Sequence, residues 1–360
     1  MKILMLVNWK VEYVTQQPEN KQPPDYVMKG EPYWFFRYWP APAEIDVVDI
    51  RSWKFLEKIE KGFLHFYVIQ TLKVLHKMKR YDLVICHGMQ SGAVLSLIRR
   101  VFSIHRPSFV VFDIGGFNSA AEKGIIMRVM QFASKSIDGV IYHTSAQKKY
   151  YERYYPWLTK KSQFIPFGTD ASFFNLNRIN KVAPNPFEHP YILCIGYSKR
   201  DWNTLLRAYS LVKTDVRLRL IGKEDLEITD KRIELFPFLS IQKLIHEITG
   251  ALFCVLPLEC FNYSYGQMTL LQQMILGKAV IAARVPSMVD YIIHGDTALF
   301  YKSKDTLDLV RKIDLLLSDS ALRNRLGANA HREVLTRFNE PMMAERIYEY
   351  VHGIMNNRWA

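Results

Sequence analysis

The sequence has few cysteines and no long apolar run, and both absences limit what the protein can be. Its 360 residues contain four cysteines, none in a CxxC pair and most inside apolar segments: Cys86, Cys194, Cys254 and Cys260. Such cysteines behave as small core hydrophobes, which argues against a disulfide framework and favours a reducing compartment. No stretch reaches the ~18 consecutive apolar residues of a membrane helix. Residues 1–8 are too short for a signal-peptide core and are expected to form a buried strand.

Several motifs that are typical of particular classes of enzyme are also missing. The ten histidines are dispersed, and neither HExxH nor a DxD motif with a preceding strand occurs, so we expect no metal and no other cofactor. Without a GxSxG elbow, a Walker A loop or a GxGxxG turn, hydrolase, kinase and dehydrogenase functions have little support. No helix-turn-helix, zinc or RNP-type pattern accompanies the basic charge, so we expect no nucleic-acid partner.

Acidic residues are scarce relative to basic ones, above all in the first half. The formal net charge is +13, and residues 1–170 hold 24 lysines and arginines against 15 aspartates and glutamates. A basic half can attract anionic lipid, a polyanion or a phosphorylated substrate, although a solvated surface has the same composition. Residues 52–79, where aromatic residues alternate with lysines, present a similar choice between a membrane-surface helix and a core-facing stripe, and we favour the stripe.

Short apolar runs alternate with longer amphipathic stretches along the whole chain. In the first half we expect strands at 3–7, 45–49, 83–86, 109–112, 139–142 and 163–165, and helices at 64–78, 92–102 and 145–154. In the second half we expect strands at 191–195, 217–221, 251–256 and 279–282, and helices at 202–212, 241–248, 268–276, 305–317, 321–335 and 341–355. Such alternation, with nearly continuous apolar strands, predicts an α/β fold with parallel sheets.

The second half restarts the pattern of the first, which predicts two domains. Residues 171–187 have few periodic apolar positions and two close prolines, as a linker has. We therefore expect Rossmann-like domains at 1–170 and 188–338, and a final helix within 339–360 that packs back on the first domain. Two doubly wound domains in tandem leave a cleft between them, where ligands bind at the carboxyl ends of the strands.

The most informative segment is residues 263–283. It predicts a glycine-containing turn, a helix of about two to three turns, a glycine stop and a strand. A helix that opens just after a strand offers free N–H groups and a positive dipole end to a diphosphate. Gly266 lets the backbone approach the ligand closely, and Gln272 can reach a ribose hydroxyl. An ordinary helix-to-strand connection with a loop glycine would have the same pattern.

Within this segment, residues 270–282 read Leu-Leu-Gln-Gln-Met-Ile-Leu-Gly-Lys-Ala-Val-Ile-Ala. This resembles the hallmark of retaining glycosyltransferase family 4, in which a Glu-x7-Glu pair contacts the donor sugar and the ribose. The alignment places the two acidic positions at Ser264 and Gln272, a neutral variant of the pair. The resemblance implies donor contacts from the whole turn and helix start: Ser264, Tyr265, Gly266, Gln267, Met268 and Gln272.

Other segments follow in the order of the same family. Residues 164–174 resemble the segment that closes its first domain, and residues 196–206 resemble a loop whose basic pair holds the donor diphosphate. The alignment puts Arg200 at the lysine of that pair, with Lys199 as the nearest substitute for the arginine, and such cations would offset leaving-group charge. By the same resemblance, the nucleotide base is expected against two later residues: Phe238 and Leu239.

The first domain matches the family less closely. His87 and Asp113 end strands where the family carries polar groups near the reaction centre, so we take them, with Arg200, as catalytic candidates. A lone histidine or aspartate at a strand end is, however, more often an ordinary hydrogen-bonding residue of the loop. The aromatic residues 33–39 are consistent either with an acceptor platform or with a packed insertion that covers the sheet edge.

The resemblance implies the GT-B fold, in which two Rossmann-like domains face each other across a cleft. It also implies a hexosyltransferase-like enzyme of polysaccharide biosynthesis that moves a sugar from a nucleoside diphosphate sugar to a hydroxyl acceptor with retention. The acceptor is expected to be a glycan or lipid-linked precursor, and the protein to be cytoplasmic with peripheral association at an anionic inner membrane face. The alternatives are a non-catalytic nucleotide- or glycan-binding relative and a GT-B sugar-nucleotide epimerase.

Overall fold

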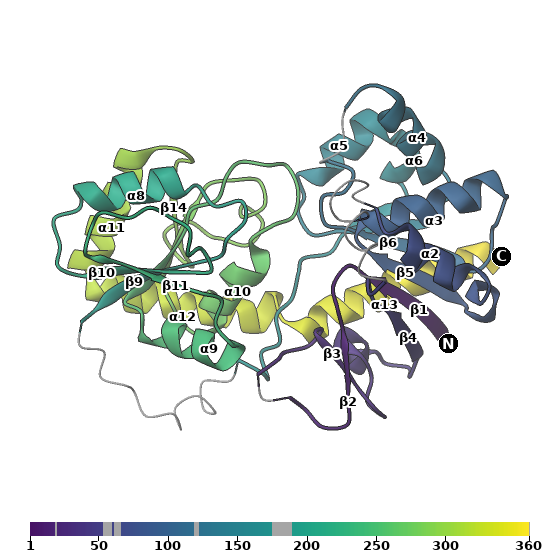
Figure 1. The fold of residues 1–360 in the computed structure, drawn as a ribbon, viewed down its shortest axis with the longest axis horizontal. Coiled ribbons are helices and arrows are strands. Elements are labelled where there is room, and N and C mark those ends of the chain that lie inside the picture. The colour runs from purple at the N-terminus through teal and green to yellow at the C-terminus, as the bar shows by residue number, and fades with distance from the viewer. Residues whose placement is uncertain (19, 53–59, 61–65, 119–121, 175–188, 360) are drawn as a thin grey trace.

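The chain folds into two α/β domains that lie side by side, as the computed structural model in Figure 1 shows. The structure describes residues 1–18, 20–52, 60, 66–118, 122–174 and 189–359. The predicted linker therefore lies largely outside the described residues, as does much of the aromatic and lysine-rich segment 52–79. Within the described residues, the helices are all too short or too polar to span a membrane.

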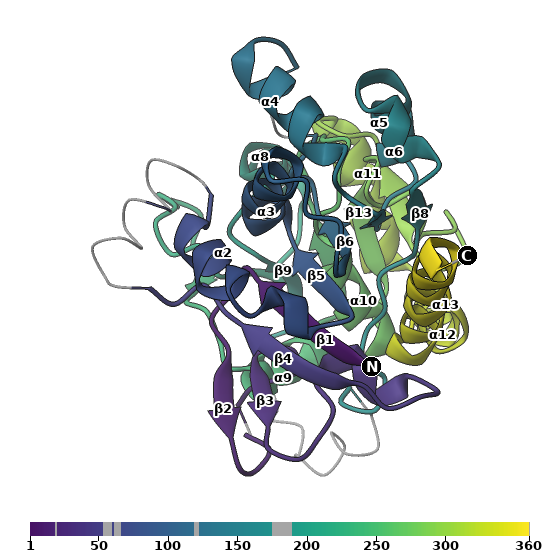
Figure 2. The ribbon, with the colours of Figure 1, turned by 90° about the vertical axis from the view of Figure 1, so that its right-hand side faces the viewer.

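The amino-terminal domain is built on a six-stranded parallel sheet of order β4-β1-β5-β6-β7-β8. Its strands are β1 (Lys2–Val7), β4 (Glu44–Val48), β5 (Leu83–His87), β6 (Ser108–Asp113), β7 (Gly139–Tyr142) and β8 (Ser162–Phe164). The central strands are buried along their length, as expected for nearly continuous apolar runs covered on both faces. A small parallel pair, β2 (Glu12–Val14) and β3 (Tyr26–Met28), lies beside this sheet (Figure 2).

Helices from distant parts of the chain cover the two faces of this sheet. One face packs on the helices α2 (Val68–Leu75), α3 (Met89–Val101), α4 (Ile125–Ser134), α5 (Gln147–Tyr154) and α6 (Pro156–Thr159) and the short 3-10 helix η3 (Met78–Arg80). The other face packs on the 3-10 helix η1 (Trp34–Tyr38) and the final helix α13 (Glu340–Trp359). Figure 2 shows α13 along one side of the domain.

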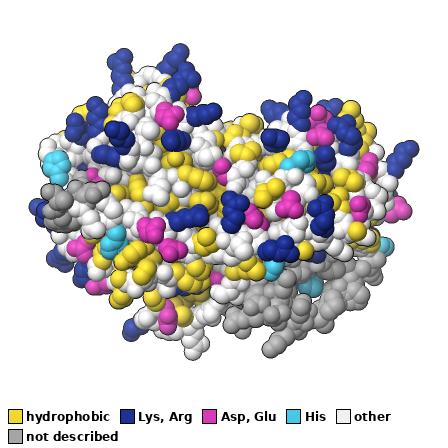
Figure 3. Space-filling view, turned by 180° about the vertical axis from the view of Figure 1, so that it is seen from behind, with side chains coloured by type: hydrophobic (Ala, Val, Ile, Leu, Met, Phe, Trp, Pro, Cys, Tyr) yellow, Lys and Arg dark blue, Asp and Glu magenta, His cyan; other side chains and the backbone are white. Residues whose placement is uncertain are grey.

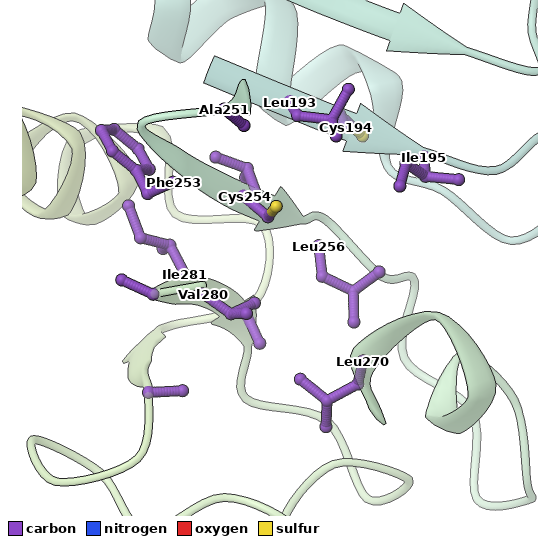
Figure 4. Close-up of a cluster of buried hydrophobic side chains, with 14 of the residues drawn as sticks. Leu193, Cys194, Ile195, Ala251, Phe253, Cys254, Leu256, Leu270, Val280 and Ile281 are labelled. Carbon is purple, nitrogen blue, oxygen red and sulfur yellow. The ribbon is translucent and has the colours of Figure 1, made fainter. Parts of the chain in front are cut away.

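The carboxyl-terminal domain repeats the plan with a sheet of order β11-β10-β9-β12-β13-β14. Its strands are β9 (Tyr191–Ile195), β10 (Arg217–Ile221), β11 (Ile233–Phe236), β12 (Phe253–Leu256), β13 (Val280–Ala283) and β14 (Leu299–Tyr301). Its helices are α8 (Trp202–Leu211), α9 (Ile241–Gly250), α10 (Gln267–Ile275), α11 (Thr306–Ser318) and α12 (Ser320–Arg337). Figure 4 shows the core between its central strands, where Leu270 of α10 points toward residues of β12 and β13.

The aromatic residues 33–39 form a packed insertion, so the alternative of an acceptor platform is wrong. Trp34, Phe35 and Phe36 are at most 5% exposed. The indole nitrogen of Trp34 donates to the carboxylate of Glu340 (3.0 Å), at the start of α13. Large rings bury most of their area when they can pack, and here α13 supplies the opposite surface.

The expected strands and helices are present with small shifts of their ends. Among the described elements, the pattern missed the helices α4 and α6, the 3-10 helix η1, and the strands β2, β3, β11 and β14. Most of these are too short to show a clear period, and α4 carries apolar residues on both sides. Three cysteines are buried as expected, whereas Cys260 is exposed in the loop after β12.

Candidate functional site

The order of the strands locates the place where each sheet can bind a ligand. In the amino-terminal sheet the chain runs outward from β1 to β4 and then crosses back to β5; in the carboxyl-terminal sheet it runs from β9 out to β11 and crosses back to β12. Ligands of doubly wound sheets bind beyond the carboxyl ends of the strands at such a reversal. The loops after β9 and β12 therefore define the candidate site of the second domain.

The loop after β12 ends in the turn that opens helix α10. Gly266 caps the helix with a φ of +80°, and a Cβ there would lie 2.9 Å from the side chain of Leu258. No side chain caps the helix, so the amides of its first turn point toward the site without an intrahelical partner. The predicted turn, helix, second glycine and strand are all present, since Gly277 has a φ of +70° and β13 follows it.

Arg200, in the loop after β9, lies against this helix start and is only 8% exposed. Its guanidinium donates to the carbonyl oxygens of Ile195 (3.0 Å) and Ser198 (3.1 Å), and it reaches Thr269 Oγ1 in the first turn of α10 at 3.4 Å. Among the described residues, no carboxylate pairs with it, and burial lowers the pKa of the guanidinium. The site therefore holds two sources of positive potential, and no carboxylate of the described residues is paired with the guanidinium.

A glycine makes this burial possible. Gly196 has a φ of +119°, and a Cβ there would lie 2.4 Å from the Arg200 guanidinium. Any other residue at this position would push the guanidinium away from the carbonyl of Ile195.

Lys199 precedes Arg200 in a left-handed conformation, with a φ of +56°. Its ammonium lies 4.1 Å from the ring centroid of Tyr263 and 5.6 Å from those of Phe261 and Tyr265. Three rings around one cation attract it through their π faces. The lysine is thus held beside the loop after β12.

The side chains of Tyr265 and Gln267 hold this loop in shape. The Tyr265 hydroxyl accepts from the amide of Phe261 (3.3 Å) and donates to the carbonyl of Glu259, and burial raises its pKa to about 12. The Gln267 amide donates to the carbonyl of Ser287 (3.3 Å). Both side chains are occupied by the protein, so these two residues can offer a ligand their backbone rather than their side chains.

The remaining predicted residues of α10 differ in exposure. Met268 is 49% exposed at the helix start, whereas Gln272, one turn later, is 5% exposed. Its neighbour Gln273 is fully buried, and neither polar atom of its amide has a hydrogen-bond partner in the described structure. An unpartnered buried amide is costly, which makes Gln273 a source of instability in this domain.

An exposed aromatic pair borders the same edge of the sheet. Phe238 follows β11 and Tyr197 follows β9; they are 66% and 62% exposed, and their ring centroids lie 5.1 Å apart in an edge-to-face arrangement. Leu239 is half-buried and packs on the domain core. The sequence patterns did not point to Tyr197, because a single tyrosine in a loop has no periodic signal.

A chain of hydrogen bonds crosses from one domain to the other at Ser264. Its hydroxyl donates to the side-chain oxygen of Gln147 on α5 (2.9 Å), and the amide nitrogen of Gln147 donates to the carboxylate of Asp113 (3.0 Å). Gln147 is fully buried and was not predicted. The serine at the first acidic position of the motif therefore contacts the other domain.

Asp113 lies at the end of β6 and is fully buried. Its carboxylate accepts from the amides of Gly115 (3.0 Å) and Gly116 (2.7 Å) and from the hydroxyl of Tyr151 (2.5 Å), besides Gln147. Burial raises its pKa, although each of these bonds favours the ionised form. Within the described residues its carboxylate holds the loop after β6 and Gln147, and its catalytic role stays a prediction.

His87 ends β5 at the reversal of the first sheet and is 9% exposed. Its ring lies 4.8 Å from Trp9, 5.5 Å from Trp34 and 5.4 Å from Phe112 between centroids. Both ring nitrogens are buried without a hydrogen-bond partner among the described residues. Burial, together with nearby His143, lowers the pKa of His87 to about 3, so the imidazole is neutral at physiological pH.

Two further contacts fix the domains face to face. The carboxylate of Asp290, after β13, accepts from the amide (2.8 Å) and hydroxyl (2.6 Å) of Ser145 and from the hydroxyl of Thr144 (3.1 Å). The hydroxyl of Tyr291 donates to the carbonyl of His143 (2.6 Å). The carboxyl ends of the two sheets thus lie on opposite sides of one cleft.

Known proteins share this arrangement. Residues 189–319, most of the carboxyl-terminal domain, match the family described as Glycosyl transferases group 1. An N,N'-diacetylbacillosaminyl-diphospho-undecaprenol alpha-1,3-N-acetylgalactosaminyltransferase of Campylobacter jejuni is 32% identical over 81 residues, which are 22% of this chain. The match spans 21% of that relative's own length.

Solved structures match over nearly the whole chain. Sucrose-phosphate synthase from Thermosynechococcus elongatus has a TM-score of 0.70 at 16% identity, covering 99% of this chain and 100% of the other. Anabaena HepE, solved in complex with UDP-glucose, has a TM-score of 0.68 at 14% identity, covering 98% and 100%. The fold is GT-B, with two Rossmann-like domains, and the family match in the second domain supports a glycosyltransferase.

Proposed function

We propose that the protein transfers a sugar from a nucleoside diphosphate sugar to a hydroxyl acceptor. The observation that carries this proposal is Arg200, a buried guanidinium without a carboxylate, beside the uncapped start of α10. A buried charge needs a counter-charge, and a helix start favours anions. A diphosphate between Arg200 and the amides of residues 266–268 would satisfy both, as the family resemblance implies.

The other parts of the site fit the remaining parts of such a donor. The exposed ring of Phe238, with Tyr197 against it, offers a stacking surface for the base. Gln272 lies one turn into α10, where it would hydrogen-bond a ribose hydroxyl. Lys199, held by its three aromatic neighbours, adds positive charge at the diphosphate.

The chemistry we propose depends on stabilising the leaving group. As the glycosidic bond breaks, negative charge develops on the diphosphate, and preorganised donors such as Arg200 and the α10 amides stabilise it without a metal. Retention by front-side attack needs no strong protein nucleophile. This fits a motif in which Ser264 and Gln272 replace carboxylates, and in which the Ser264 hydroxyl is bonded to Gln147.

We place the acceptor on the amino-terminal domain, in the cytoplasm or at the inner face of a membrane. Its basic excess suits an anionic acceptor such as a lipid-linked glycan precursor. The name of the Campylobacter relative contains diphospho-undecaprenol. A mutant of S. aureus TarM, which matches 81% of this chain and 59% of its own chain with a TM-score of 0.58 at 15% identity, was solved in complex with fondaparinux, alpha-GlcNAc-glycerol and UDP. Both names are consistent with an acceptor of this kind.

One observation favours a second function, that of a non-catalytic nucleotide-binding relative. Neither acidic position of the motif carries a carboxylate, and the buried carboxylate of Asp113 already accepts from the amides of Gly115 and Gly116 and from the hydroxyl of Tyr151.

A donor screen decides between the two functions. Thermal unfolding with UDP, GDP and their sugar conjugates identifies the donor, and mass spectrometry then follows its consumption with and without candidate glycan acceptors. Transfer or slow hydrolysis supports the enzyme, whereas tight UDP or GDP binding without any turnover supports the binding protein. Conversion of the donor sugar to its epimer without an acceptor would refute both.

A further inference from the structure

Helix α4 exposes an apolar face that nothing in the described structure covers. Ile125 is 80% exposed, Val129 42% and Phe132 45%, and their spacing of four and three residues places them on one side of the helix. Ile126 is 59% exposed beside them, while Met127 and other residues of the opposite side are buried in the domain core. A solvated helix would carry polar residues on its outer face.

The end of helix α3 extends this apolar face. Val101 is 58% and Phe102 71% exposed. The guanidinium of Arg100 lies 5.4 Å from the ring centroid of Phe132, so the end of α3 adjoins the end of α4. A group of six large exposed apolar side chains on two adjoining helices is typical of an interaction surface, whereas isolated exposed ones are not.

Exposed basic residues are frequent in the segments that carry and flank these apolar side chains. Among the described residues of 100–106, 122–135 and 145–160, nine lysines and arginines but only two glutamates are exposed. The basic residues are Arg100, Arg106, Lys123, Arg128, Lys135, Lys148, Lys149, Arg153 and Lys160. Figure 3 shows lysine and arginine side chains gathered over the protruding tip at the upper left, where α4 and α5 lie.

We propose that this tip, formed by α4, α5 and the end of α3, docks on an anionic lipid bilayer. An apolar stripe beside many cations is the pattern of helices that lie in a membrane interface, with the apolar side chains among the acyl chains and the cations at the headgroups. The tip projects from the domain, as Figures 1 and 2 show, and a projecting surface suits a bilayer. A symmetric contact with a second copy would set the same cations against each other.

The position of the tip has a consequence for the acceptor, and this step rests on the proposed function. A cavity of about 540 Å³ lies between α5 and the loop after β12, lined by Lys149, Arg153 and Asn262 among others. Tyr150, which also lines it, is 4% exposed and its hydroxyl has no partner among the described residues. A docked tip would hold this cavity near the lipid headgroups. The two segments that line the cavity, α5 and the loop after β12, are also the segments that the Ser264–Gln147 hydrogen bond joins.

Vesicle binding by the full chain tests the docking surface without reference to activity. The probes are vesicles of phosphatidylcholine alone and of phosphatidylcholine mixed with phosphatidylglycerol, separated by sedimentation. We expect binding to the mixed vesicles, reduced roughly tenfold or more by the double variant Ile125→Ser and Val129→Ser. The matched control, Leu211→Ser with Leu307→Ser, removes side chains of the other domain that are 55% and 61% exposed and should leave binding unchanged.

A second pair of variants tests the charges. Lys123→Gln with Arg128→Gln should weaken binding to the mixed vesicles by roughly fivefold for each cation removed, and less at high salt. The control pair Lys213→Gln with Lys243→Gln changes exposed lysines of the other domain and should have no effect.

Three outcomes would overturn the proposal: no binding of the wild type to mixed vesicles, unchanged binding of the Ile125 and Val129 variant, or a dimer in sedimentation velocity that this variant dissolves. UDP binding, followed by thermal unfolding, is measured on the same samples. A chain that binds vesicles but no nucleotide would refute only the proposed function, and a chain that binds UDP but no vesicles would refute only the docking surface.

Discussion

Replacing Arg200 by methionine keeps an apolar stem of similar length and removes the guanidinium. If Arg200 contacts the donor diphosphate, the variant loses charge-assisted hydrogen bonds, which contribute about 1.5–3 kcal/mol. At 1.4 kcal/mol for each factor of ten, UDP should bind roughly 10- to 150-fold more weakly. Inorganic pyrophosphate should lose affinity as well, because it presents the same charged group.

The stability of the unliganded protein should change much less. The guanidinium donates to two backbone carbonyls, of Ile195 and Ser198, and losing these bonds costs about 1 kcal/mol each. Against this, the variant no longer buries a cation without an anionic partner, which is itself unfavourable. The two effects oppose each other, so we expect the free energy of unfolding to change by no more than about 1–2 kcal/mol.

Calorimetric titration with UDP and thermal unfolding together separate these effects. For the wild type at a UDP concentration of 100 Kd, binding should add about 2.7 kcal/mol to the free energy of unfolding. In a variant that binds UDP roughly 10- to 100-fold more weakly, the gain at the same UDP concentration falls to about 0.4–1.4 kcal/mol. The control Arg207→Met changes an exposed arginine on α8 and should leave UDP affinity intact. An unchanged Kd in Arg200→Met would remove this residue from the site.

Four further predictions follow from neighbouring features. Gln272→Ala should weaken UDP or GDP binding by roughly 2- to 12-fold through loss of a ribose hydrogen bond, and equal calorimetric affinity would refute that role. Gln273→Met removes two unpartnered buried atoms at similar volume and should raise the free energy of unfolding in urea by about 1–3 kcal/mol; a decrease would mean that the amide has a partner such as a buried water. Because the pKa of His87 is lowered to about 3, the unfolded chain binds its proton first, so stability falls as the pH drops below about 6.5. Between about pH 7 and pH 5 this residue should cost about 2 kcal/mol in denaturant titrations, a loss that His87→Phe should abolish, and an equal pH dependence in the variant would contradict the buried neutral state. EDTA should leave sugar transfer unchanged in a donor-consumption assay, and loss of activity that is restored by a divalent cation would show that the mechanism uses a metal.

Local patterns in the sequence were enough for the framework of the site. The glycine turn, the helix and the strand of residues 263–283 depend on backbone freedom at Gly266 and Gly277 and on apolar periodicity, which act over a few residues. The alternation of strands and helices likewise depends on local periodicity and predicted two parallel sheets. These features could be predicted because their causes are short-range.

Helix α4 shows why a short-range pattern also fails. Its sequence, Ile-Ile-Met-Arg-Val-Met-Gln-Phe-Ala-Ser, carries apolar residues on both sides, so periodicity gives no clear signal for a helix and none for an outer face. Only the packing of Met127 and Met130 on the domain core leaves Ile125 and Val129 exposed on the other side of the helix.

The tertiary structure alone decided which candidate side chains are free. Ser264 and Asp113 are far apart in the chain, and the fully buried Gln147 that joins them belongs to no sequence motif that would have predicted it. The aromatic residues 33–39 became a packed insertion because α13, from the far end of the chain, covers them. The sequence by itself determined the two sheets and the helix start at Gly266, because these depend on neighbouring residues. The burial of a side chain, its hydrogen-bond partners and the compensation of its charge, as at Arg200, depend on contacts between distant segments. Those contacts exist only once the chain has folded.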